Sequence, residues 1–318
     1  MLEMKRLRLL WELDSRGTVA AVADALNYSP SAISQQLALL EREAGVPLLR
    51  RSGRTLELTP AAQVLVAETH DLLAGLERAE AALHRAHAEV GGTVRIAVFQ
   101  TALLALMPQV LGRLRDTHPR LRVEMVQHEP EAGLEETWTR RFDLVIAEQY
   151  PGHAAPRFSG LDRQPLITDR IRLGLPAPGV GSGAVDAVRR LADAAELPWV
   201  LEPEGAASRH WALQACRSAG FEPDVRYETA DLQAQVRLIE TGNAVALLPD
   251  LLHAGTTRAL RLIDLAGDPE RAVFTAARAS AEGHPGLAAV RAALREEAAL
   301  LASGEAGARA GRGAGAPR

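Results

Sequence analysis

The order of apolar and polar positions changes twice along the chain. Up to about residue 59, short segments carry apolar residues at helical spacing, and two short strand-like runs follow them. Residues 60 to about 90 keep a helical pattern without an interior proline until Gly91 and Gly92 interrupt it. From residue 93 onward, strand-like runs alternate with helical patterns, which predicts an α/β architecture.

The segment SPSAISQQLALLE, residues 29–41, predicts a helix with an unusual polar side. Ser29 suits the N-cap and Pro30 the first helical position. Ile33, Leu37 and Leu40 fall on one face, which predicts the core side. Gln36 lies near the edge of that face. The polar side carries hydroxyl and amide groups where charged groups are usual, from Ser31, Ser34 and Gln35.

The flanking segments give this helix a context. A short helix, TVAAVADALNY, precedes it across a tight turn, and the run PLLRRSGRTLELTP after it predicts a basic two-stranded wing. Short hydroxyls and amides can read base edges in the major groove, while arginines grip phosphate. The alternative is a merely solvated helix face. The predicted DNA contacts are Ser29, Pro30, Ser31, Ser34, Gln35, Gln36, Arg50, Arg51 and Arg54.

This region resembles the N-terminal winged helix-turn-helix of LysR-type transcriptional regulators. The resemblance rests on Ala32-Ile33-Ser34, Gln36, Leu40-Glu41, Gly45-Val46, Leu48 and Leu58-Thr59. It is dense here and looser over the rest of the chain. Three departures are Pro30-Ser31 where many members have Gln-Pro, Leu49 for a usual Phe, and Ala62 for a usual Gly. The first bears on sequence preference, and the others are changes of packing.

The long helix carries apolar residues that alternate by three and four. This heptad pattern predicts a seam for a partner helix, although the chain's own core is the alternative. The resemblance implies a linker helix that pairs subunits into a homodimer, and further into a homotetramer. A dimer would present two recognition helices to half-sites about one DNA turn apart. The predicted dimerisation residues are Leu65, Leu72, Leu76 and Leu83.

The pattern predicts a multi-domain chain. Residues 1–59 form an all-α winged helix-turn-helix domain, with the helix-turn-helix at about 18–37, and residues 60–90 form the linker helix. Residues 91–165 and 266–302 form lobe I of an effector domain, and residues 166–265 form lobe II, which is inserted into lobe I. Residues 303–318 form a disordered tail. The resemblance implies the plan of periplasmic binding proteins, whose two α/β lobes clamp a small molecule at the carboxyl ends of their strands.

Candidate effector contacts follow the ends of the predicted strands. Gln100 and Thr101 begin a helix, where the backbone amides favour an anion, and the resemblance implies effector contact at this junction. Ser208, with Arg209 beside it, is the expected cap in lobe II. Simple N-capping is the alternative for Thr101 and Ser208. Further candidates are Gln127, His128 and Glu148, of which the carboxylate would favour an amino group or pair with an arginine.

Composition limits the partners and the cellular compartment that the chain can have. The net charge of −4 means that any nucleic-acid contact must come from a local patch. The single cysteine, Cys216, excludes an intrachain disulfide, and no apolar run has the ~20 residues of a membrane span, which favours a cytoplasmic protein.

No known catalytic or metal motif is present, so we expect no enzyme, no metal and no cofactor besides a small-molecule effector. The expected partners are double-stranded promoter DNA, a second copy of the chain and the effector, with RNA polymerase as a further candidate. The rival hypotheses are an α/β enzyme or binding protein with an incidental helical N-terminal domain, and a winged-helix regulator without a sensing cleft.

Overall fold

The computed structural model describes residues 1–52, 55–86, 90–255 and 258–304, and it divides into two compact units, Met1–Ala86 and His87–Arg318. Each unit has its own core. Two of the sequence predictions, the contact by Arg54 and the disordered tail over 305–318, concern residues outside the described ones.

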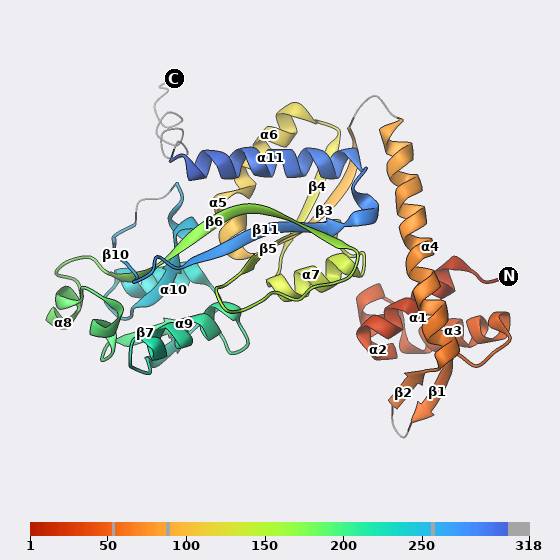
Figure 1. Cartoon of the computed structure of the whole chain (residues 1–318), viewed down its shortest axis with the longest axis horizontal. Helices are drawn as coiled ribbons and strands as arrows, with labels where there is room; N and C mark the ends of the chain where they lie inside the picture. Colours follow the sequence, from red (N-terminus) through yellow and green to blue (C-terminus); the bar gives the residue numbers. More distant parts are fainter. Residues whose placement is uncertain (53–54, 87–89, 256–257, 305–318) are drawn as a thin grey trace. The chain divides into compact units, whose positions relative to one another are not determined.

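Three helices, a hairpin and a long helix make up unit 1 (Figure 1). Thr18 caps the second helix by accepting a hydrogen bond from Ala21 N at 3.1 Å, and Asn27 ends it in the left-handed region at φ 54°. The next helix therefore begins after a tight turn, as predicted. The elements are α1 (Met4–Arg16), α2 (Val19–Leu26), α3 (Pro30–Ala44), β1 (Leu49–Ser52), β2 (Thr55–Leu58) and α4 (Pro60–Arg85).

The core of unit 1 uses the predicted apolar faces. Leu10 and Trp11 of α1 are buried together with Ile33, Leu37 and Leu40 of α3. Helix α4 ends at Arg85, short of the predicted end near residue 90. The apolar repeat extends to Val90, but a repeat does not mark where the backbone stops being helical, and helix ends are the least certain part of such a prediction.

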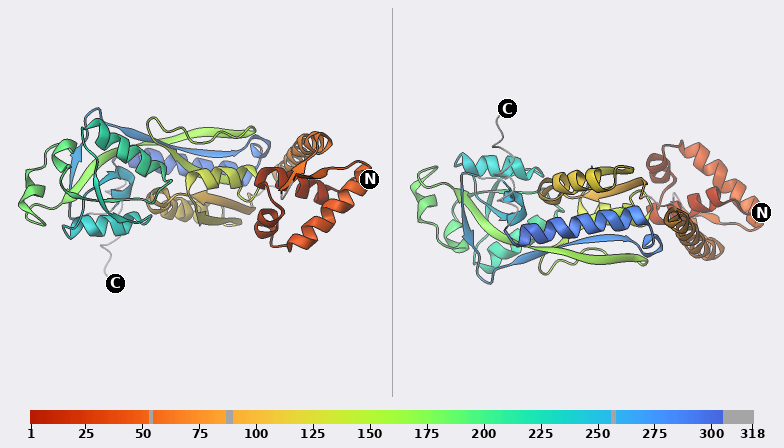
Figure 2. Two further views of the ribbon diagram at one scale, coloured as in Figure 1. Left: turned by 90° about the horizontal axis from the view of Figure 1, so that it is seen from below. Right: turned by 90° about the horizontal axis from the view of Figure 1, so that it is seen from above.

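Lobe I of unit 2 is built on β3, which runs parallel to both β4 and β5. Helices α6 and α11 lie side by side over one face of this sheet, and α7 covers the other (Figures 1 and 2). Apolar residues of the strands are buried on both faces, as expected for a covered parallel sheet. The elements are β3 (Gly92–Val98), α5 (Gln100–Ala105), α6 (Met107–Thr117), β4 (Leu121–Gln127), α7 (Pro130–Trp138), β5 (Leu144–Gln149), η3 (Ala279–Ala281) and α11 (Pro285–Ala302).

Two long strands, β6 (Leu161–Pro176) and β11 (Glu270–Arg278), run through the middle of the sheet, whose order is β10-β6-β11-β5-β3-β4. Residues 161–170 of β6 pair with β11, and from Ile171 onward β6 pairs with β9 and β10 of lobe II. The change of pairing partner therefore lies near Arg170, close to the predicted crossing near residue 165. Pro165, which lacks an N–H, is accommodated at a bulge opposite Phe274 within the same strand.

Lobe II packs helices against the far half of β6. Trp199, Trp211 and Cys216 belong to one core, and Val236 and Ile239 of α10 to a second. Burial raises the pKa of the Cys216 thiol to about 12, so it behaves as a small core residue. The elements are α8 (Gly183–Ala187), η1 (Leu191–Ala194), β7 (Pro198–Leu201), α9 (Ala207–Ser218), β8 (Asp224–Glu228), α10 (Leu232–Glu240), β9 (Ala246–Pro249), η2 (Asp250–His253) and β10 (Leu260–Asp264).

Candidate functional site

The polar face of α3 is exposed in unit 1, as the sequence predicted. Ser29 caps the helix by accepting a hydrogen bond from Ala32 N at 3.2 Å, and its hydroxyl lies 3.0 Å from that of Ser31. Ser34 donates its hydroxyl to Pro30 O at 2.9 Å, which leaves its oxygen as an acceptor. Gln35 is exposed, so this face offers an amide and several hydroxyl oxygens to a groove.

Gln36 stands apart from the other predicted DNA contacts. Its side chain is half-buried, and its oxygen accepts a hydrogen bond from Arg6 Nε of α1 at 3.0 Å. Arg6 also pairs with Glu43 of α3. The structure therefore places Gln36 where it joins α3 to α1, beside the core edge and away from the centre of the exposed face.

The wing is a two-stranded antiparallel hairpin in which Arg50 faces Glu57. The two side chains form an exposed ion pair, with Arg50 Nη2 2.8 Å from a Glu57 carboxylate oxygen. Such a surface pair is worth little, so a phosphate can replace the carboxylate. Arg51 is exposed as well, and the local positive charge of the wing is smaller than its arginines alone suggested.

Glu41 holds the wing against α3, a role that sequence reasoning missed. One of its carboxylate oxygens accepts hydrogen bonds from the backbone of Leu48 at 2.8 Å and Leu49 at 3.0 Å. Thr59 adds a second anchor, because its hydroxyl donates to Pro47 O at 2.9 Å while it caps α4. The wing is thus positioned by side chains on the helices that flank it.

The heptad seam of α4 divides into two parts. Ala62 and Thr69 are buried in unit 1, and Leu65 is half-buried. Toward the other end, Leu72 and Leu76 are about half exposed, at 50% and 49%. Leu83, at the same end, is 64% exposed. Val64, near the start of the helix and outside the heptad pattern, is 65% exposed. The first half of the seam therefore packs against the chain's own core, whereas a partner helix stays a prediction for the exposed half.

In unit 2, a buried arginine gathers the polar groups near the crossing. Arg271 of β11 is 1% exposed, and Nε and Nη2 donate to Asp169 of β6 at 2.9 and 2.7 Å. It also pairs with Glu148 and donates to the Thr101 hydroxyl at 2.5 Å and the Tyr150 hydroxyl at 3.3 Å. Nearby carboxylates outweigh the burial that opposes its charge and raise its pKa, so Arg271 stays charged.

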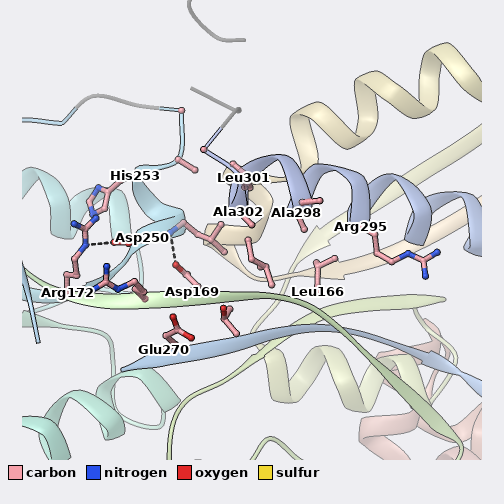
Figure 3. Close-up of a pocket in the computed structure, with 18 residues that line it drawn as sticks. Leu166, Asp169, Arg172, Asp250, His253, Glu270, Arg295, Ala298, Leu301 and Ala302 are labelled. Atoms are coloured by element: carbon pink, nitrogen blue, oxygen red, sulfur yellow. Dashed lines mark hydrogen bonds and ion pairs between the residues drawn. The ribbon is translucent and has the colours of Figure 1, made fainter. Parts of the chain in front are cut away.

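This Arg271 network, consisting of Arg271, Glu148, Asp169, Thr101 and Tyr150, joins the lobes. The other carboxylate oxygen of Asp169 accepts a hydrogen bond from Leu251 N of η2 at 2.9 Å (Figure 3). Burial raises the pKa of Asp169, an effect that Arg271 and the Leu251 amide oppose. A single set of contacts therefore connects lobe I, both crossing strands and lobe II.

The candidate effector residues lie in different environments. Thr101 is fully buried, and its hydroxyl accepts a hydrogen bond from Arg271. Effector contact by Thr101 stays a prediction. Burial raises the pKa of Glu148 to about 7, against the opposing effect of Arg271. His128 Nε2 lies 3.3 Å from Glu136, and Gln127 is exposed at the end of the edge strand β4.

Ser208 is not the cap of α9, because Ala206 occupies that position and makes no side-chain cap bond. Ser208 donates to the carboxylate of Glu202, whose pKa is raised by burial and partly lowered by this bond. Arg209 is tied to Glu202 O at 2.8 Å and to Glu228 at 2.6 Å. The helix start thus uses an acidic partner that the sequence prediction did not include.

Gln100 bridges the lobes directly. Its amide nitrogen donates to Asp231 at 2.9 Å, and its oxygen accepts from Leu232 N at 2.9 Å, at the start of α10. The Gln100 bond lowers the pKa of Asp231. A residue predicted from its place at a strand end therefore holds the two lobes together in this arrangement.

Comparison with known proteins identifies both units. The family model described as a LysR substrate binding domain matches residues 87–299, and that of the bacterial regulatory helix-turn-helix protein, lysR family, matches 4–63. The chain is 31% identical to the transcriptional dual regulator GltC of Bacillus subtilis over 80% of this chain and 83% of that protein.

The chain belongs to the LysR family. It is also 26% identical to the HTH-type transcriptional activator IlvY of Salmonella typhimurium, over 82% of this chain and 86% of that one. A full-length OxyR variant from Pseudomonas aeruginosa has the same fold, with a TM-score of 0.62 at 19% identity, covering 94% of this chain and 95% of that one. These findings confirm the predicted fold class and the interpretation as a DNA-binding transcriptional regulator with an effector-binding domain.

Two further features of this LysR-family chain bear on other chemistry. Within the described residues, no group of three or more His, Cys, Asp or Glu side chains is placed to hold a metal ion. None of the helices in the described part is long and apolar enough to cross a membrane.

A cavity of about 640 Å³ lies between β6, η2 and the end of α11 (Figure 3). Gly255 and Gly304, which border it, are the last described residues before 256–257 and 305–318.

Proposed function

We propose that this regulator reads promoter DNA by seating the exposed face of α3 in the major groove. The observation that carries the proposal is the uncharged surface formed by Ser31, Ser34 and Gln35 on the second helix of a helix-turn-helix. A glutamine amide can pair two-pronged with adenine, and short hydroxyls allow close approach of the backbone. Promoter DNA as the partner makes the cytoplasm the site of action.

The wing supplies contacts that do not depend on sequence. Arg50 and Arg51 are exposed on β1, which Glu41 holds against α3. Arginines placed beside a recognition helix neutralise phosphates and fix its register on the duplex. We include the neighbouring Arg54 in this set from its position in the sequence.

Two copies of the chain pair through α4. The exposed side chains of Leu72, Leu76 and Leu83 repeat at heptad spacing on the half of the helix that unit 1 does not cover. Burying them against a second α4 would remove apolar surface from water and place two recognition helices on one operator. A homotetramer, formed by pairing dimers, is the larger assembly that we propose.

A small-molecule effector binds unit 2 next to the Arg271 network and changes promoter binding. The supporting observation is that Gln100 and Glu148 contact groups that join the lobes. Glu202 of lobe II lies close enough to Glu148 to help raise its pKa. An effector with different affinity for two arrangements of the lobes shifts the population between them.

Fluorescence anisotropy with the DNA upstream of the chain's own gene tests the proposal. Gln35→Ala should weaken binding to that DNA by roughly 1–3 kcal/mol and leave binding to unrelated DNA nearly unchanged. Arg51→Ala should weaken binding to both and reduce the salt dependence by about one phosphate contact. Gln233→Ala, which removes an exposed amide from α10, is the matched control. Equal and small losses on both DNAs for Gln35→Ala and Arg51→Ala would contradict the groove placement.

A further inference from the structure

A second cavity, of about 650 Å³, lies in unit 2, and none of the five residues of the Arg271 network lines it. Four stretches that are distant in sequence form its walls: the loop after β5, η1, α9 and the connection from β10 to β11. Pockets that bind small molecules occupy about 300–1,000 Å³ and combine apolar walls with a few polar groups. Both the size and the lining of this cavity match that description.

The floor of the cavity is apolar and includes an aromatic ring. Trp211 is 9% exposed, and its ring is held against Tyr150, with the ring centroids 6.0 Å apart. Leu191, Leu265 and Pro269 complete the apolar wall. A buried indole with one side toward a cavity favours a flat ring as its neighbour, because aromatic pairs gain more than their buried area alone provides.

The rim carries charges that already have partners. Arg190 Nε lies 3.1 Å from Asp193, and Asp264 lies 3.4 Å from Arg170. Gln214 and Ser218 of α9 add neutral donors and acceptors. A charged ligand would have to displace one of these ion pairs to gain an opposite charge, whereas a neutral one can use the amide and the hydroxyl without disturbing them.

We propose that this cavity is a second small-molecule site and that it takes a neutral, planar aromatic compound of one or two rings. The bound compound stacks beside Trp211, with its polar group toward Gln214 and Ser218. Its position also matters for the lobes, because Pro269 in its wall accepts a hydrogen bond from Ile171 N at 2.9 Å, where β6 changes partners. The compound would contact lobe II, the loop after β5 in lobe I and the connection from β10 to β11.

Binding of 5-fluoroindole to the full-length chain, followed by the ¹⁹F line width, tests the site. Ser218→Phe fills the cavity from the last turn of α9, and Arg217→Phe places the same ring on the neighbouring position, which does not line it. Both positions are exposed, so neither change disturbs the core. We expect Ser218→Phe to weaken binding at least about tenfold, which is 1.4 kcal/mol, and Arg217→Phe to leave it within about twofold.

The ligand class has its own test. The same ring with a charge, 5-fluoroindole-2-carboxylate, should bind more weakly than 5-fluoroindole. Tighter or equal binding of the carboxylate that Ser218→Phe abolishes would overturn the neutral class. The site would be overturned if 5-fluoroindole did not bind up to its solubility, whether because the cavity closes or because a second copy of the chain covers it. Equal binding by both variants would overturn the site as well. Since no DNA is involved, these failures are separate from a failure of promoter binding.

Discussion

The exposed face of α3 and the Arg271 network both consist of polar side chains, yet their surroundings are opposite. Ser31, Ser34 and Gln35 lie within five residues on one helix and face solvent. Arg271 is buried and draws its partners from α5, β5 and β6, with sequence separations of up to 170 residues. The first set is available to an external partner, whereas the second is already satisfied by the protein itself.

The difference teaches where each set acts. An exposed amide keeps its water until a base edge replaces it, so its removal changes binding and leaves folding nearly untouched. A buried arginine holds carboxylates that would otherwise be buried without compensation, so its removal acts on folding first. Stability measurements on the two sets should therefore separate clearly.

The largest expected effect is that of Arg271→Ala. It leaves Glu148 and Asp169 in a buried position without their cation, which should cost about 3–5 kcal/mol of unfolding free energy. Urea unfolding followed by tryptophan fluorescence measures it. Arg170→Ala, which removes a 41% exposed arginine paired with Asp268, is the control and should cost less than about 1 kcal/mol. Similar costs for both would mean that the buried network does not stabilise the lobes.

Glu148→Gln sharpens the comparison through pH. Burial raises the pKa of Glu148 from 4.5 to about 7, so the folded state binds this proton more tightly than the unfolded state does. Its contribution to stability is complete below pH 4.5 and is lost as the pH rises through about 7. Glu148→Gln should reduce this decline by roughly 1–3 kcal/mol between pH 5 and 8.

Urea titrations across that pH range provide the measurement for Glu148→Gln. Glu296→Gln, at an exposed position of α11 where the carboxylate pairs with Arg113, should keep the wild-type slope. An unchanged slope in Glu148→Gln would mean that this carboxyl is ionised in the folded state across the whole range.

The smallest effects belong to α3. Ser29→Ala removes the N-cap bond to Ala32 N and should lower the stability of unit 1 by about 1 kcal/mol. Gln35→Ala, at an exposed position on the same helix, should stay within about 0.5 kcal/mol of wild type. Thermal unfolding by circular dichroism compares them. A loss for Gln35→Ala as large as that for Ser29→Ala would place Gln35 among the groups that hold the helix.

Local patterns carried much of the prediction. The spacing of Ile33, Leu37 and Leu40 determines the buried face of α3, so the opposite face follows without any tertiary information. The same holds for the turn at Asn27 and the cap at Ser29, whereas the cap at Thr59 was not predicted. The role of Glu41 escaped notice, because a carboxylate that accepts two backbone amides looks like any surface glutamate in the sequence.

In unit 2, position after a strand end drew attention to Gln100, Thr101 and Glu148, but it could not say what each side chain touches. Arg271 and Asp169 are one arginine and one aspartate among many on β-strands, and only the antiparallel register of β6 and β11 brings them together. Glu202 became visible only through its contact with Ser208.

The sequence by itself determined the helices of unit 1, the exposed polar face of α3 and the alternation of strands and helices in unit 2, because these depend on residues within a few turns of one another. Tertiary structure alone decided which half of the α4 seam is covered, where β6 crosses between lobes and that Arg271 is the centre of the network. Burial and pairing between distant segments are properties of the folded chain, and no local spacing encodes them.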